Sequence, residues 1–105
     1  MKMLVLSAFS LNMVDKPALI AVREVTLREA QRIAGQGLIS SVGHVDTAAI
    51  FESLLGVPVH AARTSIFLEK GREAMIGQYC GPRLVPGTKE LPAGGAIQWL
   101  IVKVC

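Results

Sequence analysis

The chain has 105 residues, of which 51% are hydrophobic and 18% are charged, and its formal net charge is +3. This length suits one domain over residues 1–105, and the apolar content excludes a disordered chain. The apolar runs are far shorter than the roughly 18 residues that cross a membrane, so we expect a cytosolic protein with no membrane partner, and the mild basic excess suits a small anionic ligand better than a long nucleic acid.

The first part of the chain predicts two strands and a short helix. Residues 3–9 form an almost wholly apolar run, typical of a strand that is buried in a sheet. Residues 18–25 have the composition of a second strand. The pattern from Thr26 to Glu29 is a capping box, which should open a short helix that runs through Ala34.

A second helix is expected in the middle of the chain. It should begin at His44 or Val45 and continue to Leu55, because Gly56 and Pro58 then end it. The helical character comes from Ala48, Ala49, Phe51, Glu52, Leu54 and Leu55.

The remainder of the chain predicts three more strands and a long loop. Residues 64–68 and 73–79 have strand composition and flank a hairpin turn at 69–72. Residues 80–96 are rich in glycine and proline and should form a loop, after which residues 98–104 close the chain as a strand. The fold class is therefore α/β, a single domain with a mixed central sheet flanked by short helices.

His44 is the candidate for chemistry that the pattern itself suggests. It follows Gly43 at an expected helix start, where free backbone N–H groups attract anions. An imidazole in that place could give or take a proton beside a bound phosphate. The alternative is a histidine that only caps the helix or packs, and the pattern alone favours this alternative.

The other candidates are weaker when each is taken alone. Ser10 and Asn12 follow the first strand, where sheet proteins often place ligand contacts, and Arg83 could bind a phosphate from its glycine- and proline-rich loop. No histidine, cysteine or carboxylate spacing matches a metal site, so metal catalysis is not expected. Cys80 and Cys105 should be free thiols.

Short motifs follow one another along nearly the whole chain: Ala8 to Met13, Ser41 to His44 with Thr47, Leu54 to Gly56, Ile66 to Gly71, Gln78, and Arg83 with Leu84. No single motif is specific, whereas their order is fairly specific. This ordered series resembles the viral ring nucleases, which are small type III anti-CRISPR proteins of archaeal viruses, phages and mobile elements, with cellular relatives.

The resemblance implies a two-fold homodimer that binds cyclic tetra-adenylate, the second messenger of type III CRISPR complexes, between its subunits. The dimer would act in the cytoplasm, that of the host if the protein is viral. It would cut the ring without a metal or other cofactor, giving linear di-adenylate that ends in a 2′,3′-cyclic phosphate. This reaction would switch off the nucleases that the messenger activates.

The same resemblance assigns roles to individual residues. The catalytic residue would be His44, which would protonate the departing 5′-oxygen while the ribose 2′-hydroxyl attacks the phosphorus. The substrate-binding positions would be Ser7, Ser10, Asn12, Ser41, Gln78 and Arg83.

The sequence departs from the family pattern in two places. Ser7 stands where an asparagine is usual, so one ligand contact is weakened or remade. The glutamate that usually follows the pair Arg83 and Leu84 is missing, and the nearest acid is Glu90. The missing glutamate leaves open a protein that sequesters the cyclic nucleotide without cutting it. The small size and basic charge leave open a small DNA-binding or virion-associated protein.

Overall fold

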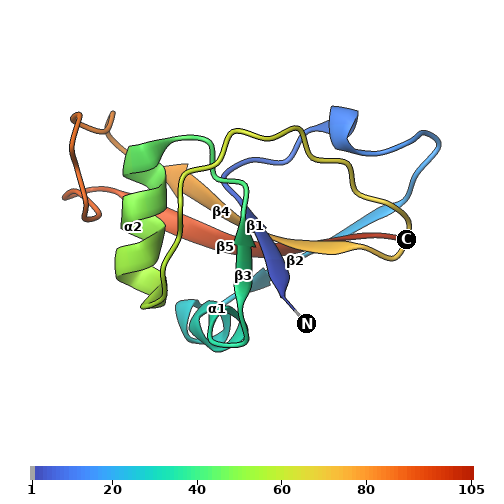
Figure 1. The fold of residues 1–105 in the computed structure, drawn as a ribbon, viewed down its shortest axis with the longest axis horizontal. Coiled ribbons are helices and arrows are strands. Elements are labelled where there is room, and N and C mark those ends of the chain that lie inside the picture. The colour runs from blue at the N-terminus through green and yellow to red at the C-terminus, as the bar shows by residue number, and fades with distance from the viewer. Residues whose placement is uncertain (1) are drawn as a thin grey trace.

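Strand β1 (Met3–Leu6) lies inside a five-stranded sheet, as its apolar composition predicts (Figure 1). The computed structural model describes residues 2–105, and the strands follow the order β2-β5-β4-β1-β3. β1 pairs in parallel with β3 (Leu38–Ser40) and with β4 (Glu73–Cys80). β5 (Ala96–Val104) is antiparallel to β4 and to β2 (Ile20–Val25), which confirms the mixed sheet.

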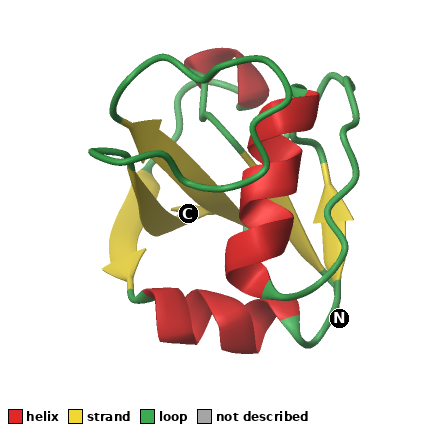
Figure 2. Ribbon diagram, turned by 90° about the vertical axis from the view of Figure 1, so that its left-hand side faces the viewer, coloured by secondary structure: helices red, strands yellow, loops and turns green. Residues whose placement is uncertain are grey.

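Both faces of the sheet are covered by apolar residues. Alternate residues of a strand point to opposite faces, so Val5 and Met75 pack against the helices, whereas Leu4 and Ile76 pack under loops. Figure 2 shows the two longer helices together on one side, with irregular chain on the other. The two longer helices therefore pack on one side of a sheet whose middle strands, β1 and β4, supply much of the core.

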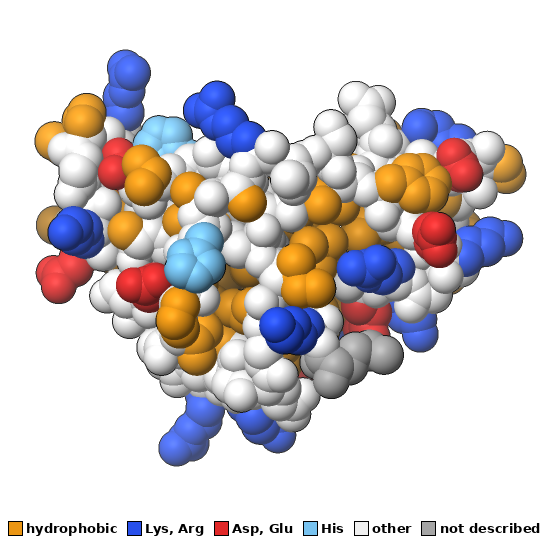
Figure 3. All heavy atoms as spheres, viewed as in Figure 1, with side chains coloured by type: hydrophobic (Ala, Val, Ile, Leu, Met, Phe, Trp, Pro, Cys, Tyr) orange, Lys and Arg blue, Asp and Glu red, His pale blue; other side chains and the backbone are white. Residues whose placement is uncertain are grey.

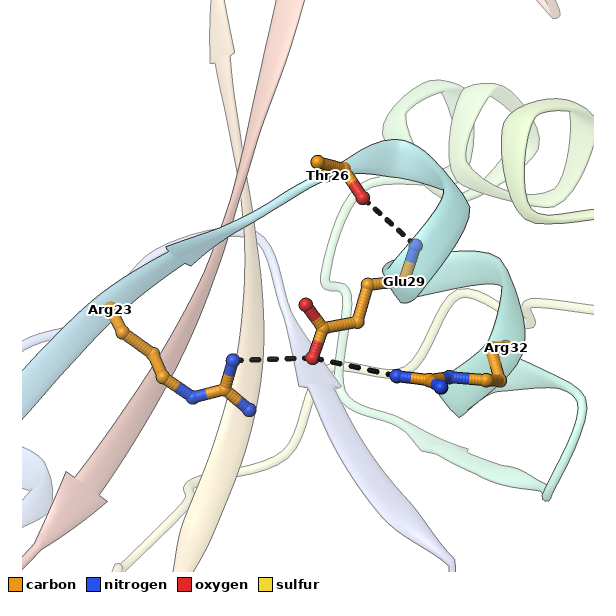
Figure 4. Close-up of polar contacts among 4 residues, drawn as sticks. All are labelled: Arg23, Thr26, Glu29 and Arg32. Carbon is orange, nitrogen blue, oxygen red and sulfur yellow. Dashed lines mark hydrogen bonds and ion pairs between the residues drawn. The ribbon is translucent and has the colours of Figure 1, made fainter.

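Helix α1 (Leu27–Ala34) begins at the predicted cap. The hydroxyl of Thr26 accepts a hydrogen bond from the backbone N–H of Glu29 at 3.1 Å (Figure 4). The carboxylate of Glu29 lies 3.2 Å from a guanidinium nitrogen of Arg23 and 3.9 Å from one of Arg32. The predicted helix is thus confirmed, and its glutamate is engaged in exposed ion pairs with these two arginines.

Helix α2 (Val45–Leu55) also has the predicted bounds, and Gly56 ends it with a φ of 74°. Phe51 and Trp99 pack against each other with ring centroids 5.0 Å apart and ring planes tilted by 58°, and both are buried. The two rings occupy the space that a side chain at Gly77 would fill, since a Cβ there would lie 2.7 Å from Cζ3 of Trp99. This contact fixes the middle of α2 against β4 and β5.

The predicted strand over residues 64–68 is wrong. This segment is irregular, and its hydrogen bonds leave the sheet: the backbone N–H of Leu68 donates to the carbonyl of Met13 at 2.6 Å. Leu68 is buried and closes the apolar cluster on the loop side of the sheet. Only Leu68 of this segment is buried, and most of the rest is exposed, so the strand-like composition reflects neither full burial nor pairing in the sheet. The turn at 69–72 does form, since the backbone N–H of Arg72 donates to the carbonyl of Glu69 at 3.0 Å, but it does not join two strands into a hairpin.

Other bounds differ from the sequence prediction. β1 ends at Leu6, and a short 3-10 helix, η1 (Leu11–Met13), follows it. β3 was not predicted, and β5 begins at Ala96, two residues earlier than expected. Within residues 2–105, no helix is long and apolar enough to span a membrane.

Gly77→Ala should lower the free energy of unfolding by about 1 to 3 kcal/mol, because two buried rings must move to admit one methyl group. Gly35→Ala is the matched control, since Gly35 has an ordinary helical φ of −63° and the nearest atoms to a Cβ lie at 3.5 Å. Urea denaturation of both variants measures the difference. Equal stability of the two variants would contradict the close packing of Phe51 and Trp99 against Gly77.

Candidate functional site

The carboxyl ends of three parallel strands meet at one edge of the sheet. β1, β3 and β4 run in the same direction, with Val5 opposite Ser40 and Leu6 opposite Ile76. The backbone N–H of Ser41 continues this pairing by donating to the carbonyl of Val5 at 3.0 Å. The segments that leave these strands, and with them most of the predicted site residues, therefore start from a common edge.

His44 is the N-cap of α2. Its Nδ1 accepts a hydrogen bond from the backbone N–H of Asp46 at 3.2 Å, and the side chain is exposed to solvent. A neutral imidazole carries hydrogen on only one nitrogen, so in this arrangement the hydrogen is on Nε2. The capping role that the sequence left open is thus present, and it leaves the Nε2–H free of that contact.

His44 and Arg83 line the same hollow, although they are 39 positions apart in the sequence. The hollow has a volume of about 460 Å³. Apolar residues complete its wall together with one acid, and the full lining is His44, Asp46, Arg83, Leu84, Val85 and Pro86. An imidazole, a guanidinium and a carboxylate thus share one open concavity.

A second hollow, of about 410 Å³, is lined by Gly43, the residue that precedes His44 in the chain. Arg63 lines it as well, and its Nε donates to the carbonyl of Gly43 at 3.1 Å. The hydroxyl groups of Ser41 and Thr64 lie 3.0 Å apart at the same place. Figure 3 shows both histidines of the chain on the face that carries α2.

Sequence reasoning missed Arg63 and the role of Asp46 in the hollow. Both reach the site through contacts between residues that are far apart in the chain, Arg63 with Gly43 and Asp46 with Gly87. The spacing of these residues in the sequence carries no signal for either contact. The isolated bridge between Val42 and Ala61 is what brings the arginine alongside the helix start.

Other predicted site residues do not line the hollow of His44. The hydroxyl of Ser10 accepts from the backbone N–H of Asn12 at 3.3 Å, capping η1. Gln78 has the same strand parity as Ile76 and leaves the sheet on the face opposite the helices. Ser7 follows β1 directly but is also absent from that lining, as is the exposed Glu90.

Among residues 2–105, no group of three histidine, cysteine, aspartate or glutamate side chains could hold a metal ion. Cys80 and Cys105 are free and exposed. The charged side chains that line the two hollows are those of Arg63, Arg83 and Asp46. Such a set can bind an anion and place it beside an imidazole.

Comparison with known proteins gives a family and similar solved structures. The family model described as STIV B116-like matches residues 3–90. The fold is similar to that of B116 of Sulfolobus turreted icosahedral virus (STIV), with a TM-score of 0.78 over 97% of this chain and 98% of that chain, at 23% sequence identity. No curated protein sequence matches significantly. At this identity, the structural likeness shows the shared fold.

The cap at His44 predicts how its variants differ in stability. His44→Ala should lower the free energy of unfolding by about 1 kcal/mol, because the N–H of Asp46 loses its acceptor. His44→Asn should keep the wild-type value, since asparagine is a preferred N-cap. Thermal or urea unfolding distinguishes them, and an equal loss in both variants would show that the capping contact contributes nothing.

Proposed function

The chain belongs to the STIV B116-like family, and from this premise we propose that it is a metal-independent ring nuclease that cleaves cyclic tetra-adenylate. The observation that carries the proposal is the meeting of His44 and Arg83 in one hollow. A proton donor and an anion-binding group from distant parts of the chain are what the cleavage of a phosphodiester by its own ribose requires. The choice of cyclic tetra-adenylate as the substrate rests on the ordered motifs that resemble those of ring nucleases.

In the proposed reaction the nucleophile belongs to the substrate. The ribose 2′-oxygen forms a bond to phosphorus, the bond from phosphorus to the 5′-oxygen breaks, and that oxygen takes the Nε2 proton of a His44 imidazolium. The proton of the 2′-hydroxyl passes to water, from which the imidazole is protonated again. Two such cuts convert one ring into two linear di-adenylates with 2′,3′-cyclic phosphates, and no water is consumed.

The protein's part is orientation and proton supply. Orientation of a nucleophile can contribute up to about 7 to 11 kcal/mol, and a positioned general acid contributes roughly 100- to 10,000-fold. An imidazolium has hydrogens on both nitrogens, so the proton-donating form of His44 gives up the contact with the N–H of Asp46. The N–H released at the start of α2 can then donate to a phosphate oxygen.

We also propose a two-fold homodimer with the ring in the seam. Val45 and Val85, on α2 and on the wall of the hollow, are 66% and 70% exposed, and a second chain would cover such side chains. Two chains at +3 each would attract a ring with four phosphodiester charges. Each chain would supply one His44, so two cuts of one ring would use the two subunits, in the cytoplasm of the cell that makes the messenger.

A second candidate is a protein that binds the ring and returns it intact. The observation in its favour is that Glu90 does not line the hollow, so it does not replace the glutamate usual in ring nucleases. The acid that does line the hollow is Asp46, which lies on α2 and not in the loop after Leu84, where the usual glutamate would stand. Tight binding with the ring recovered uncut would establish this function in place of cleavage.

Cleavage is tested with labelled cyclic tetra-adenylate in the presence of EDTA. The wild-type protein should release linear di-adenylate with a 2′,3′-cyclic phosphate, and His44→Asn should cleave at least about 100-fold more slowly because it keeps the cap but lacks the acid. His60→Asn is the matched control, since His60 is exposed and its side chain lines neither hollow. Equal rates for wild type and His44→Asn would refute the assignment.

Arg83→Ala should weaken binding of the ring by roughly 10- to 100-fold, the effect expected for loss of hydrogen bonds to a charged group. Arg28→Ala removes the same charge from an exposed position on α1 and should leave binding within about twofold. Titration of the cleavage-deficient His44→Asn background with the labelled ring measures both. Identical affinities in the two arginine variants would remove Arg83 from the proposed site.

A further inference from the structure

We infer that Asp46 is a positioning residue that ties the loop bearing Arg83 to the start of α2. The inference rests on the proposed function for the ligand that Arg83 binds. Its geometric part, the tie itself, rests on contacts within the chain alone.

Asp46 hydrogen-bonds to His44 and to the loop that carries Arg83, through different atoms. Its backbone N–H donates to Nδ1 of His44 at 3.2 Å, and its carboxylate Oδ1 accepts from the backbone N–H of Gly87, also at 3.2 Å. Gly87 lies four positions after Arg83 in the same loop. One residue therefore links the imidazole to the loop that carries the guanidinium.

The other hydrogen bonds of this loop in the described part of the chain are local. The hydroxyl of Tyr79 donates to the carbonyl of Pro82 at 2.5 Å, and the N–H of Gly95 donates to the carbonyl of Pro92 at 2.9 Å. Thr88 likewise bonds to Val85 within the loop. These bonds shape the loop but do not attach it to α2, so among the hydrogen bonds of residues 2–105 the one from Gly87 to the carboxylate of Asp46 is what joins the loop to α2.

A carboxylate beside an anion site has an electrostatic disadvantage. Its negative charge would repel the phosphates that Arg83 attracts. An amide oxygen could accept from the N–H of Gly87 equally well without this charge. The positioning role therefore predicts opposite effects of two substitutions: Asp46→Ala should weaken ring binding because the loop is released, whereas Asp46→Asn should bind the ring at least as tightly as wild type.

The test measures the loop and the ligand separately. Amide hydrogen exchange of Gly87, followed by NMR without any ring, should accelerate roughly 2- to 10-fold in Asp46→Ala, the effect of losing one hydrogen bond, and should stay near wild type in Asp46→Asn. Ring affinity in the cleavage-deficient His44→Asn background should fall by a similar factor in Asp46→Ala only.

Glu52→Ala is the control for a merely weakened helix. The carboxylate of Glu52 accepts from the backbone N–H of Val59 at 2.9 Å at the other end of α2, so its loss removes the same kind of bond away from the hollow. It should leave exchange at Gly87 and ring affinity unchanged. Unchanged exchange at Gly87 in Asp46→Ala, or equal effects of Asp46→Ala and Glu52→Ala, would overturn the inference, whereas failure of the wild-type protein to bind the ring would overturn the proposed function and leave the exchange result standing.

Discussion

Parallel pairing on both sides of β1 is the constraint on which the rest of the structure depends. Because β3 and β4 run in the same direction as β1, the chain leaves all three strands at one edge of the sheet. The segment after β3 becomes α2 with His44 at its start, and the segment after β4 becomes the loop with Arg83. The arginine and the histidine therefore come together through sheet topology, whereas neither is near the other in sequence.

Residues that start and end helices made much of the fold predictable from the sequence. The bounds of α1 and α2 follow from Thr26, from the glycine after Leu55 and from helical spacing, all of which act within a few residues. The three-residue β3 has no such signal, because it exists only through pairing with β1. The error at 64–68 has the same origin: strand-like composition does not report whether the backbone of a segment pairs with a neighbouring strand, and here it forms an irregular stretch in which only Leu68 is buried.

Some residues of the candidate site could likewise be predicted from the sequence, and others are recognised only in the structure. His44 and Arg83 stand out in the sequence because of their setting, one at a helix start and one between prolines and glycines, and the structure brings them together. Asp46 and Arg63 stand out only in space, through contacts with Gly87 and Gly43. His44 also has two uses for one nitrogen, since Nδ1 serves the helix cap in the neutral form and carries hydrogen in the acid form. The same side chain therefore contributes to helix stability and to the proposed proton transfer.

The close approach of Phe51 and Trp99 over Gly77 has a consequence for how this protein can evolve. α2 is anchored at its middle by these rings, so the direction of its first turn relative to β4 depends on three residues that line neither hollow. A larger residue at position 77 could become established only together with a smaller one at 51 or 99. We expect lineages of this fold to exchange these three positions as a set, and a change in one alone to alter the alignment of the histidine with the arginine.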